Sequence, residues 1–303
     1  MFKNTKLTIV AELCQNHNGD ISILKEMIHA AKESGISCIK VQDIQSRELS
    51  HRKRFDSKSN DSIFRPYETE HSRLKNLDLP DNFLDVFIEE CEKYECTPIV
   101  TPFTFASINR ISNKNFKYIK VASYDCSSFE FIKQLLKLKK PLIISTGATY
   151  EEEIVKTSQI LKNINFAFLH CVSIYPTPLE KCNLSKINFL KKLTKNVGWS
   201  DHTLFEKTKH IASLISILQG ASIIERHFTI LPRDKTKDGP VSINEKDAKE
   251  LVNISELNHD EIKKMLDDLE PNWQKCIGNG LTNLSKEEVL NRDYYKGRFV
   301  SKK

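Results

Sequence analysis

Residues 141–171, PLIISTGATYEEEIVKTSQILKNINFAFLHC, contain two short apolar runs separated by a segment of helix length. The runs at 142–146 and 166–171 are rich in Ile, Leu and Phe, and their lengths are typical of buried strands. The segment 150–162 opens with three glutamates near its start, and acidic residues favour the first turn of a helix. The stretch therefore predicts a strand–helix–strand unit of a parallel sheet.

The same alternation of strand and helix continues along most of the chain. Amphipathic segments of helix length separate most of the apolar runs, and Gly220 follows one of them as a predicted C-cap. About eight repeats predict an α/β fold, a closed (β/α)₈ TIM barrel; an open doubly wound sheet is the alternative, but no GxGxxG turn favours it. The predicted strands span residues 7–12, 37–42, 97–101, 118–123, 142–146, 166–171, 197–202 and 222–227, and the clearest helices span 81–94, 150–162, 205–219 and 245–257.

The length of the chain and the extent of the repeat indicate one domain with an extension. The chain has 303 residues, and a barrel of this kind needs about 250. Residues 43–80 interrupt the repeat with a long, polar and charged segment, which we interpret as an elaborated loop. The repeat is lost from residue 270 onward. We therefore predict a barrel domain over residues 1–269 and a linker-like C-terminal extension over residues 270–303.

Composition and charge exclude several classes of protein. The hydrophobic fraction of 39% and the charged fraction of 28% are ordinary for a globular chain, and a formal charge of +6 is mild, so we expect no nucleic-acid partner. Eight cysteines without a CxxC pair indicate reduced, buried thiols. No run approaches the ~20 apolar residues of a membrane helix, and the N-terminus lacks a signal-peptide pattern. We expect a cytoplasmic protein without a membrane partner.

Polar residues end nearly every predicted strand. Active sites of (β/α)₈ barrels form at the C-terminal ends of the strands, so these side chains are candidates for chemistry. Residues two apart on a strand share one face, which places Lys40 with Gln42 and leaves Val41 on the other face. The strand-end residues are Glu12, Lys40, Gln42, Thr101, Lys120, Ser123, Ser145, Ser200, His202, Glu225 and His227, with Asp201 and Arg226 on the opposite faces of their strands.

Two lysines and two histidines of this set indicate specific chemistry. Lys40 and Lys120 lie within apolar strands, where a buried ammonium group is costly unless it is paired or meets an anion, so they predict a pocket for phosphate and carboxylate. His202 and His227 end consecutive strands, and paired imidazoles are a common start of a divalent metal site. A lone buried histidine is more often a core residue, and a hydroxyl at a strand end often caps the next helix, but neither interpretation explains the pairs.

Six short motifs together resemble the sialic acid (N-acetylneuraminate) synthase family. They follow the family's order over about residues 7–250. The resemblance implies a (β/α)₈ barrel enzyme, a transferase, that joins phosphoenolpyruvate to a sugar aldehyde and releases phosphate, giving a 2-keto-3-deoxy sugar acid. The motifs are AELCQNHNGD (11–20), TPF (101–103), STG (145–147), HCVSIYPTP (170–178), WSDHT (199–203) and IERHF (224–228).

The resemblance also implies roles for residues of this chain. His202 and His227 would bind Mn²⁺, or another divalent cation such as Mg²⁺ or Co²⁺, which acts as a Lewis acid on the aldehyde oxygen. Glu12 and Asp238 would handle the protons of water and alcohol. The expected phosphoenolpyruvate site is Lys40, Gln42, Thr101, Lys120, Ser123, Ser145 and Ser200, and the expected sugar contacts are Asp125, Ser173 and Tyr175.

Several features on the sugar side depart from the family pattern. The family usually has Glu where this chain has Asp125, and often Asn where it has Ser173. Full-length relatives add an antifreeze-like domain that supplies an arginine to the partner subunit's site. We expect no such domain here, because residues 291–299 resemble the linker before it. Arg292, Arg298 or the loop 43–80 would then replace that arginine, or the sugar differs.

Other interpretations of the sequence stay open. The same chemistry on a shorter or phosphorylated aldose would need a second cationic cluster, which Arg52, Lys53 and Arg54 would supply. A different class of protein would bind metal or sugar without catalysis, although every residue expected to hold metal and phosphoenolpyruvate is present. We also expect a homodimer through barrel–barrel contact.

Overall fold

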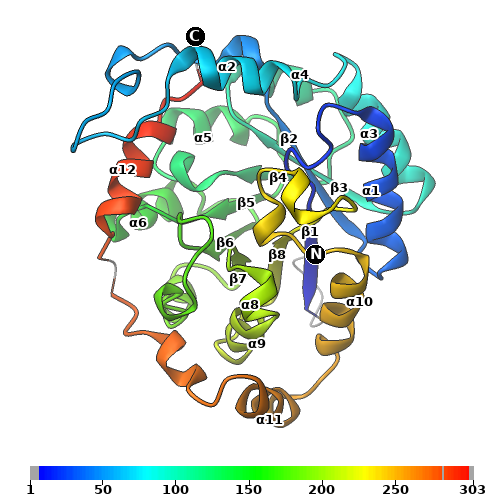
Figure 1. Ribbon diagram of the computed structural model, residues 1–303, viewed down its shortest axis with the longest axis vertical. Coiled ribbons are helices and arrows are strands. Elements are labelled where there is room, and N and C mark those ends of the chain that lie inside the picture. The colour runs from blue at the N-terminus through cyan, green and yellow to red at the C-terminus, as the bar shows by residue number, and fades with distance from the viewer. Residues whose placement is uncertain (1–6, 282, 300–303) are drawn as a thin grey trace.

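Eight parallel strands form one closed barrel in a computed structural model that describes residues 7–281 and 283–299 (Figure 1). Each strand pairs with its neighbours in the sequence, and β1 completes the ring by pairing with β8. This arrangement confirms the predicted (β/α)₈ barrel. The strands are β1 Thr8–Glu12, β2 Cys38–Asp43, β3 Thr97–Pro102, β4 Tyr118–Val121, β5 Leu142–Ser145, β6 Phe166–His170, β7 Val197–Asp201 and β8 Ile223–His227.

Helices follow every strand and surround the barrel (Figure 1). Within the described residues, no helix is long and apolar enough to cross a membrane. The α-helices are α1 Ile21–Glu33, α2 Tyr67–Lys75, α3 Phe83–Lys93, α4 Phe105–Ile111, α5 Phe129–Leu136, α6 Glu151–Ile160, α7 Lys186–Leu190, α8 Phe205–Thr208, α9 Ile211–Leu218, α10 Glu245–Ile254, α11 His259–Leu269 and α12 Lys286–Tyr295. Short 3₁₀ turns are η1 Ser46–Glu48, η2 Lys53–Phe55, η3 Ser123–Asp125, η4 Leu179–Lys181, η5 Arg233–Lys235, η6 Gly239–Val241 and η7 Trp273–Ile277.

A small apolar layer fills the inside of the barrel. It is separate from the larger core between the strands and the helices. Five of its members each lie two residues before a polar strand-end residue, so the alternation of strand faces places them one level beneath the strand ends. The layer therefore closes the barrel under any site at its C-terminal mouth. It consists of Val10, Cys38, Ile99, Ile143, Ala167, Leu169 and Ile223, with Tyr118 packed against it.

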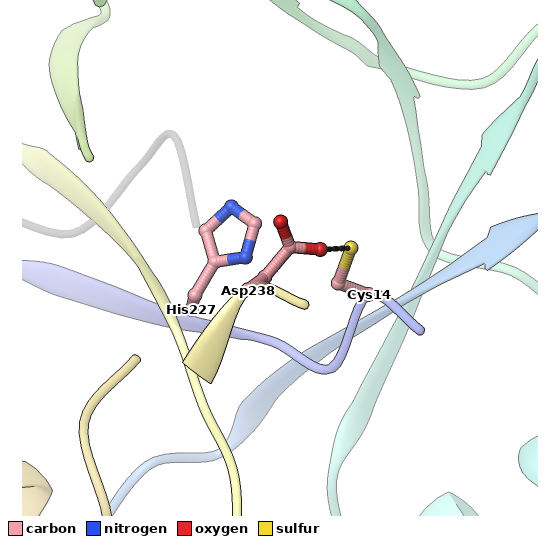
Figure 2. A group of neighbouring side chains, drawn as sticks. All are labelled: Cys14, His227 and Asp238. Carbon is pink, nitrogen blue, oxygen red and sulfur yellow. Dashed lines mark hydrogen bonds between the residues drawn. The ribbon is translucent and has the colours of Figure 1, made fainter. Parts of the chain in front are cut away.

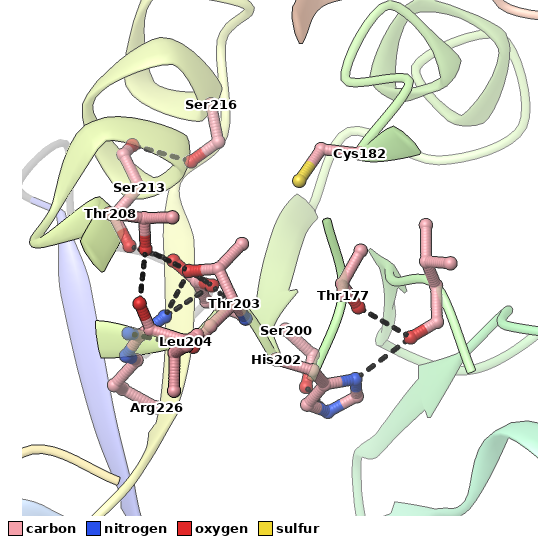
Figure 3. Close-up of polar contacts among 12 residues, drawn as sticks. Thr177, Cys182, Ser200, His202, Thr203, Leu204, Thr208, Ser213, Ser216 and Arg226 are labelled. Atoms are coloured by element: carbon pink, nitrogen blue, oxygen red, sulfur yellow. Dashed lines mark hydrogen bonds and ion pairs between the residues drawn. The ribbon is translucent and has the colours of Figure 1, made fainter. Parts of the chain in front are cut away.

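The outer faces of β7 and β8 carry a buried ion pair. Asp201 and Arg226 are register partners, both fully buried, and they form a salt bridge. The Asp201 carboxylate also accepts hydrogen bonds from the Thr203 amide at 2.9 Å and from Ser213 of α9 at 2.8 Å. Figure 3 shows this group around Arg226 lying apart from the His202 ring. The pair therefore fixes the two strands to α9 without entering the mouth of the barrel.

One predicted helix is wrong, because residues 205–219 form two helices. Lys209 interrupts them with a φ of 47° and a ψ of −127°, a conformation that side chains other than glycine rarely adopt. The predicted C-cap is confirmed: Gly220 has a φ of +89°, and its amide donates to the Ile217 carbonyl at 2.8 Å. All eight cysteines are free and buried, as predicted.

The long loop after β2 and the C-terminal segment pack against each other at the mouth of the barrel. The loop contains helix α2 in addition to two 3₁₀ turns. Arg298 forms an ion pair with Glu70 of α2, and the Ser50 amide donates to the Arg298 carbonyl at 2.8 Å. Arg292 of α12 pairs with Glu153 of α6. Residues 286–299 thus lie across the end of the barrel where the strands terminate.

Candidate active site

A cavity of about 340 Å³ opens at the C-terminal ends of the strands. Its walls come from the strand ends, from the loop after β2 and from α12. The structure brings fourteen side chains singled out from the sequence into this one cavity. They are Glu12, Lys40, Gln42, Thr101, Lys120, Ser123, Ser145, Ser173, Tyr175, Ser200, His202, Glu225, His227 and Asp238.

Two buried lysines and two buried glutamates form the floor of the cavity. Lys40 lies between two carboxylates: it forms an ion pair with Glu12, its register partner on β1, and its Nζ is 3.1 Å from Glu225 Oε1. Lys120 approaches the same Glu225 oxygen at 3.9 Å. All four residues are less than 5% exposed. Each ammonium group has a carboxylate partner, although ion pairs only partly repay the desolvation of buried charges.

Burial and the neighbouring opposite charges shift the pKa values of these groups in opposite directions. Burial alone would raise the pKa of Glu225, but Lys120 and Lys40 outweigh it and hold the pKa low, at about 2. Burial lowers the pKa of Lys40 to about 7, although the Glu225 carboxylate opposes the shift. An anion entering the cavity would favour the charged form of Lys40 and raise its pKa.

Hydroxyl groups surround the two ammonium groups. Lys120 Nζ donates to Ser145 Oγ at 2.6 Å, and Ser200 Oγ donates to Glu225 Oε1 at 3.0 Å. Thr101 Oγ1 is buried and has no hydrogen-bond partner among the described residues, which leaves it available to a ligand. At Gly147, an added Cβ would lie 2.7 Å from Cys171 Sγ and 3.0 Å from Ser123 Oγ and would displace these side chains.

The two candidate metal ligands lie side by side, with ring centroids 5.5 Å apart. His202 Nδ1 donates a hydrogen bond to the Val172 carbonyl at 3.0 Å, and Nε2 lies 3.0 Å from Tyr175 Oη. His227 Nδ1 is buried with no partner among the described residues. Burial lowers the pKa of both rings, to about 3 for His202. An unsatisfied imidazole nitrogen beside a second imidazole fits a divalent cation.

A second group of ligand-type atoms shares His227. Cys14, His227 and Asp238 each offer one atom, and these atoms lie within 4.8 Å of one another. Figure 2 shows Asp238 between the ring and the thiol, and Cys14 Sγ donates to Asp238 Oδ2 at 2.8 Å. Burial and the neighbouring Asp238 raise the pKa of the Cys14 thiol. The sequence analysis missed Cys14, although it lies within the first quoted motif.

Asp125 is the predicted site residue that the structure does not bring into this cavity. It lines a neighbouring cavity of about 410 Å³ with aromatic walls, and it accepts a hydrogen bond from Ser128 Oγ at 3.1 Å. Burial raises the pKa of Asp125 to about 6. The two cavities share Phe103, Ala122, Tyr124, Tyr295 and Arg298.

Cationic side chains line the rim of the main cavity, but Arg52, Lys53 and Arg54, which the sequence suggested as a second cationic cluster, are not among them. Arg52 instead donates to the Asp293 carbonyl at 3.3 Å and Arg54 pairs with Asp293, so both pack against the C-terminal segment. Arg292 pairs with Glu153 and also lies outside the cavity lining. The rim cations are Arg65, Arg73, Lys237 and Arg298. Only Arg298 and the loop 43–80 had been named as candidates.

Fold and site define a (β/α)₈-barrel protein with a buried lysine pair and a cluster of side chains that could bind a metal ion in one cavity. The NeuB family profile matches residues 27–268. The chain is 30% identical over 304 residues to the N,N′-diacetyllegionaminic acid synthase of Campylobacter jejuni, which covers 98% of this chain and 85% of that relative. This chain belongs to the NeuB family.

Two further comparisons extend the similarity in sequence and in fold. An uncharacterised protein of Methanocaldococcus jannaschii is 33% identical over 300 residues, covering 97% of this chain and 82% of that protein. The solved structure of an N-acetylneuraminic acid synthetase from Leptospira borgpetersenii superposes with a TM-score of 0.73 at 24% identity, covering 96% of this chain and 91% of the other. At that identity the superposition supports the fold alone.

Proposed function

We propose that this protein is an enzyme that condenses phosphoenolpyruvate with a sugar aldehyde, giving a nonulosonic, sialic-acid-like 2-keto-3-deoxy sugar acid and phosphate. The observation that carries the proposal is the pair of buried ammonium groups, Lys40 and Lys120, that face an open cavity lined by hydroxyl side chains. Buried cations of this kind suit a ligand that carries both a phosphate and a carboxylate. The name of the Campylobacter relative points to the same class of product.

The phosphoenolpyruvate subsite lies on the β2–β5 side of the cavity in this proposal. Lys120 with Ser145, and Lys40 with Gln42, would donate to the anionic oxygens. The unpartnered Thr101 hydroxyl would complete this set. Ser123 and Ser200 are the remaining proposed contacts.

The proposed metal is Mn²⁺ or a similar divalent cation, held by His202 and His227. When bound, it would supply Lewis acidity at the aldehyde oxygen of the sugar. The chain itself orients the His202 ring, because the Val172 carbonyl fixes the tautomer that leaves Nε2 directed into the cavity. Tyr175 stacks on the His202 ring, with centroids 4.1 Å apart, and shields it.

Glu12 and Asp238 are the proposed proton-handling groups. In the overall reaction, C3 of phosphoenolpyruvate bonds to the aldehyde carbon, water adds at C2, and the C–O bond to phosphate breaks. Asp238 is positioned to accept a proton from water, because its carboxylate lies at the cavity wall beside His227. Glu12 Oε1 accepts from the Cys14 amide at 2.8 Å and from Gln42 Nε2 at 3.0 Å, which fixes its orientation on the floor.

The proposed sugar contacts lie toward α12. Tyr175 and Ser173 belong to the cavity wall, and Asn291 of α12 donates to the Ser173 carbonyl at 3.1 Å. Asp125 would contact a part of the sugar that extends into the neighbouring aromatic cavity. Arg298, which lines both cavities, has an Nε without a hydrogen-bond partner among the described residues. We propose that it supplies the arginine contact to the sugar.

The rim cations favour a second candidate, the same chemistry on a phosphorylated or otherwise anionic aldose. Arg65, Arg73, Lys237 and Arg298 lie at the rim, whereas Glu70 is the carboxylate that pairs with Arg73 and Arg298. Partial burial and the neighbouring Arg73 lower the pKa of Lys237 to about 8, as expected where cations outnumber anions. An added phosphate on the sugar would relieve this imbalance.

Phosphate release tests both candidates. Purified protein, Mn²⁺ and phosphoenolpyruvate would be assayed with N-acetylmannosamine, its diacetamido-trideoxy relatives, and plain and phosphorylated aldoses of four to six carbons. Release that depends on one aldehyde confirms the synthase and identifies its sugar. Arg298→Ala, compared with Arg292→Ala outside the cavity, should raise the KM of that sugar. If the protein binds metal but no aldehyde supports phosphate release, the result favours a protein that binds metal or sugar without catalysis.

Metal content provides a second test that does not depend on the sugar. His202→Ala and His227→Ala should each lower bound Mn²⁺ after dialysis and abolish turnover. His259→Ala, at an exposed position on α11, is the matched control and should keep the wild-type Mn²⁺ content. Unchanged metal content in both cavity variants would refute the assignment.

A further inference from the structure

Cys14 occupies an unusual place immediately after β1. Its backbone has a φ of 48°, in the left-handed region that favours glycine, yet it carries a side chain. That side chain lines the cavity, and the residue is only 6% exposed. The thiol lies at the part of the cavity wall where Asp238 and His227 also lie. A residue kept in this conformation at a cavity wall invites a functional explanation.

Ligand-type atoms of β8 and of the loop after it converge at this thiol, in a group made of Cys14, His227 and Asp238 without His202. Sγ of Cys14 lies 2.8 Å from Asp238 Oδ2, and one atom from each of Cys14, Asp238 and His227 falls within 4.8 Å of the others (Figure 2). His227 is 5% exposed, and its Nδ1 has no partner among the described residues. Ligands bound to one metal ion at ordinary bond lengths of about 2.0–2.3 Å are separated by distances of this order.

We propose that Cys14, beside Asp238, is a further protein donor to the divalent cation that His227 holds, and that it biases the site toward thiophilic cations such as Co²⁺ and Zn²⁺. Thiolate sulfur is a soft donor, whereas Mg²⁺ and Mn²⁺ prefer oxygen ligands. This inference rests on the metal site of the proposed function and adds a residue to it.

The coordination step changes no oxidation state. The S–H bond of Cys14 breaks and a sulfur–metal bond forms, and the proton passes to solvent by way of the Asp238 carboxylate that now accepts it. Binding of one cation therefore releases one proton that would stay on the thiol if sulfur were not a ligand. The cation itself supplies the positive charge that stabilises the thiolate.

Cobalt spectroscopy of the full chain tests the proposal. Bound Co²⁺ gives visible d–d bands, and a thiolate ligand adds an intense charge-transfer band in the near ultraviolet. The wild type should show both, and Cys14→Ser and Cys14→Gly should keep the d–d bands and lose the charge-transfer band. Glycine suits the left-handed φ, so Cys14→Gly serves as the variant that folds without strain. Cys38→Ser, in the apolar layer beneath the site, should retain both signals.

Titrations of cation affinity and proton release complete the test. Cys14→Ser should reduce the preference for Zn²⁺ over Mn²⁺ by about tenfold or more, and it should release one proton fewer per Zn²⁺ bound. Cobalt d–d bands without a charge-transfer band in the wild type would overturn the role of Cys14 and leave the histidine site standing. A charge-transfer band that persists in both Cys14 variants would also overturn it. If the wild type takes up no Co²⁺ at all, the metal site of the proposed function fails together with this inference.

Discussion

Lys120 is the residue whose role can be tested most directly. Its ammonium group donates to Ser145 Oγ at 2.6 Å and lies 3.9 Å from Glu225, inside a cavity open to substrate. Lys120→Ala should raise the KM for phosphoenolpyruvate roughly 10- to 100-fold, since a hydrogen bond to a charged group contributes about 1.5–3 kcal/mol. Steady-state assays of phosphate release measure this KM. Lys133→Ala on the exposed surface of α5 is the control, and an equal KM in both variants would contradict the assignment.

Individual residues also show where sequence reasoning succeeds and where it stops. Lys40 and Glu225 were identified because a charged side chain inside an apolar strand is a local signal, and strand alternation gives its direction. Cys14 gave no such signal, because Asp238, the residue that it contacts, lies 224 positions away in the sequence. The loop 43–80 was named as a source of cations, but Arg65 and Arg73 could not be singled out within it, because the path of the loop depends on its contacts with residues 286–299.

At the scale of elements, the strand pair β7–β8 depends on a charge pair that faces away from the site. Asp201 compensates the buried Arg226 and also holds Ser213 of α9. Asp201→Ala should lower the free energy of unfolding by about 3–5 kcal/mol, because it leaves an unpaired buried guanidinium group. Urea denaturation measures the change.

Two comparison variants separate charge from packing at this pair. Asp268→Ala, at an exposed position of α11, should change stability by less than about 0.5 kcal/mol. The double variant Asp201→Leu with Arg226→Met should recover part of the loss, since apolar residues of similar volume can replace a buried ion pair. A double variant less stable than Asp201→Ala would show that the hydrogen bonds, rather than the unpaired charge, determine the effect.

The break between α8 and α9 is a second feature at this scale. Lys209 adopts a φ of 47°, and an L-residue in the left-handed region costs about 1–2 kcal/mol. Lys209→Gly should therefore raise the free energy of unfolding by about 0.5–1 kcal/mol, once the larger entropy of glycine in the unfolded chain is subtracted. Lys207→Gly, inside α8, should instead lower it by a similar amount. Thermal unfolding of both variants measures the contrast, and a destabilising Lys209→Gly would contradict the strain argument.

For the whole molecule, the periodicity of the sequence predicted the barrel because local and global preferences agree. All eight predicted strands lie within two residues of the observed ones at either end. Each strand and helix of the repeat is a local pattern, and closure follows from repeating it eight times. The break at Lys209 was missed because neither glycine nor proline marks it. Helix α2 and the placement of α12 were missed because contacts distant in sequence, such as Arg298 with Glu70, determine where they pack.

Burial of histidines across the molecule predicts its response to acid. Desolvation lowers the pKa of His17, His170 and His210 to about 4 in each case, against 6.5 for a free imidazole. Between pH 6.5 and pH 4 the unfolded chain binds protons that the folded chain excludes. The stability contributed by these neutral rings is therefore complete above pH 6.5 and is lost as pH falls toward 4.

The slope of stability against pH tests this prediction. His17, His170 and His210 together contribute at most about 4 kcal/mol per pH unit, since each proton contributes about 1.4 kcal/mol per unit, and the lowered pKa values of His202 and His227 act in the same direction. Urea denaturation at pH 7, 6 and 5 should show the free energy of unfolding falling at each step. His170→Gln keeps a donor for the Cys182 carbonyl, which His170 Nε2 contacts at 2.8 Å, but binds no proton, so it should reduce the slope. His259→Gln, at an exposed site, should leave the slope unchanged. A free energy that stays flat from pH 7 to pH 5 would mean that these rings are protonated in the folded chain and that burial does not keep them neutral.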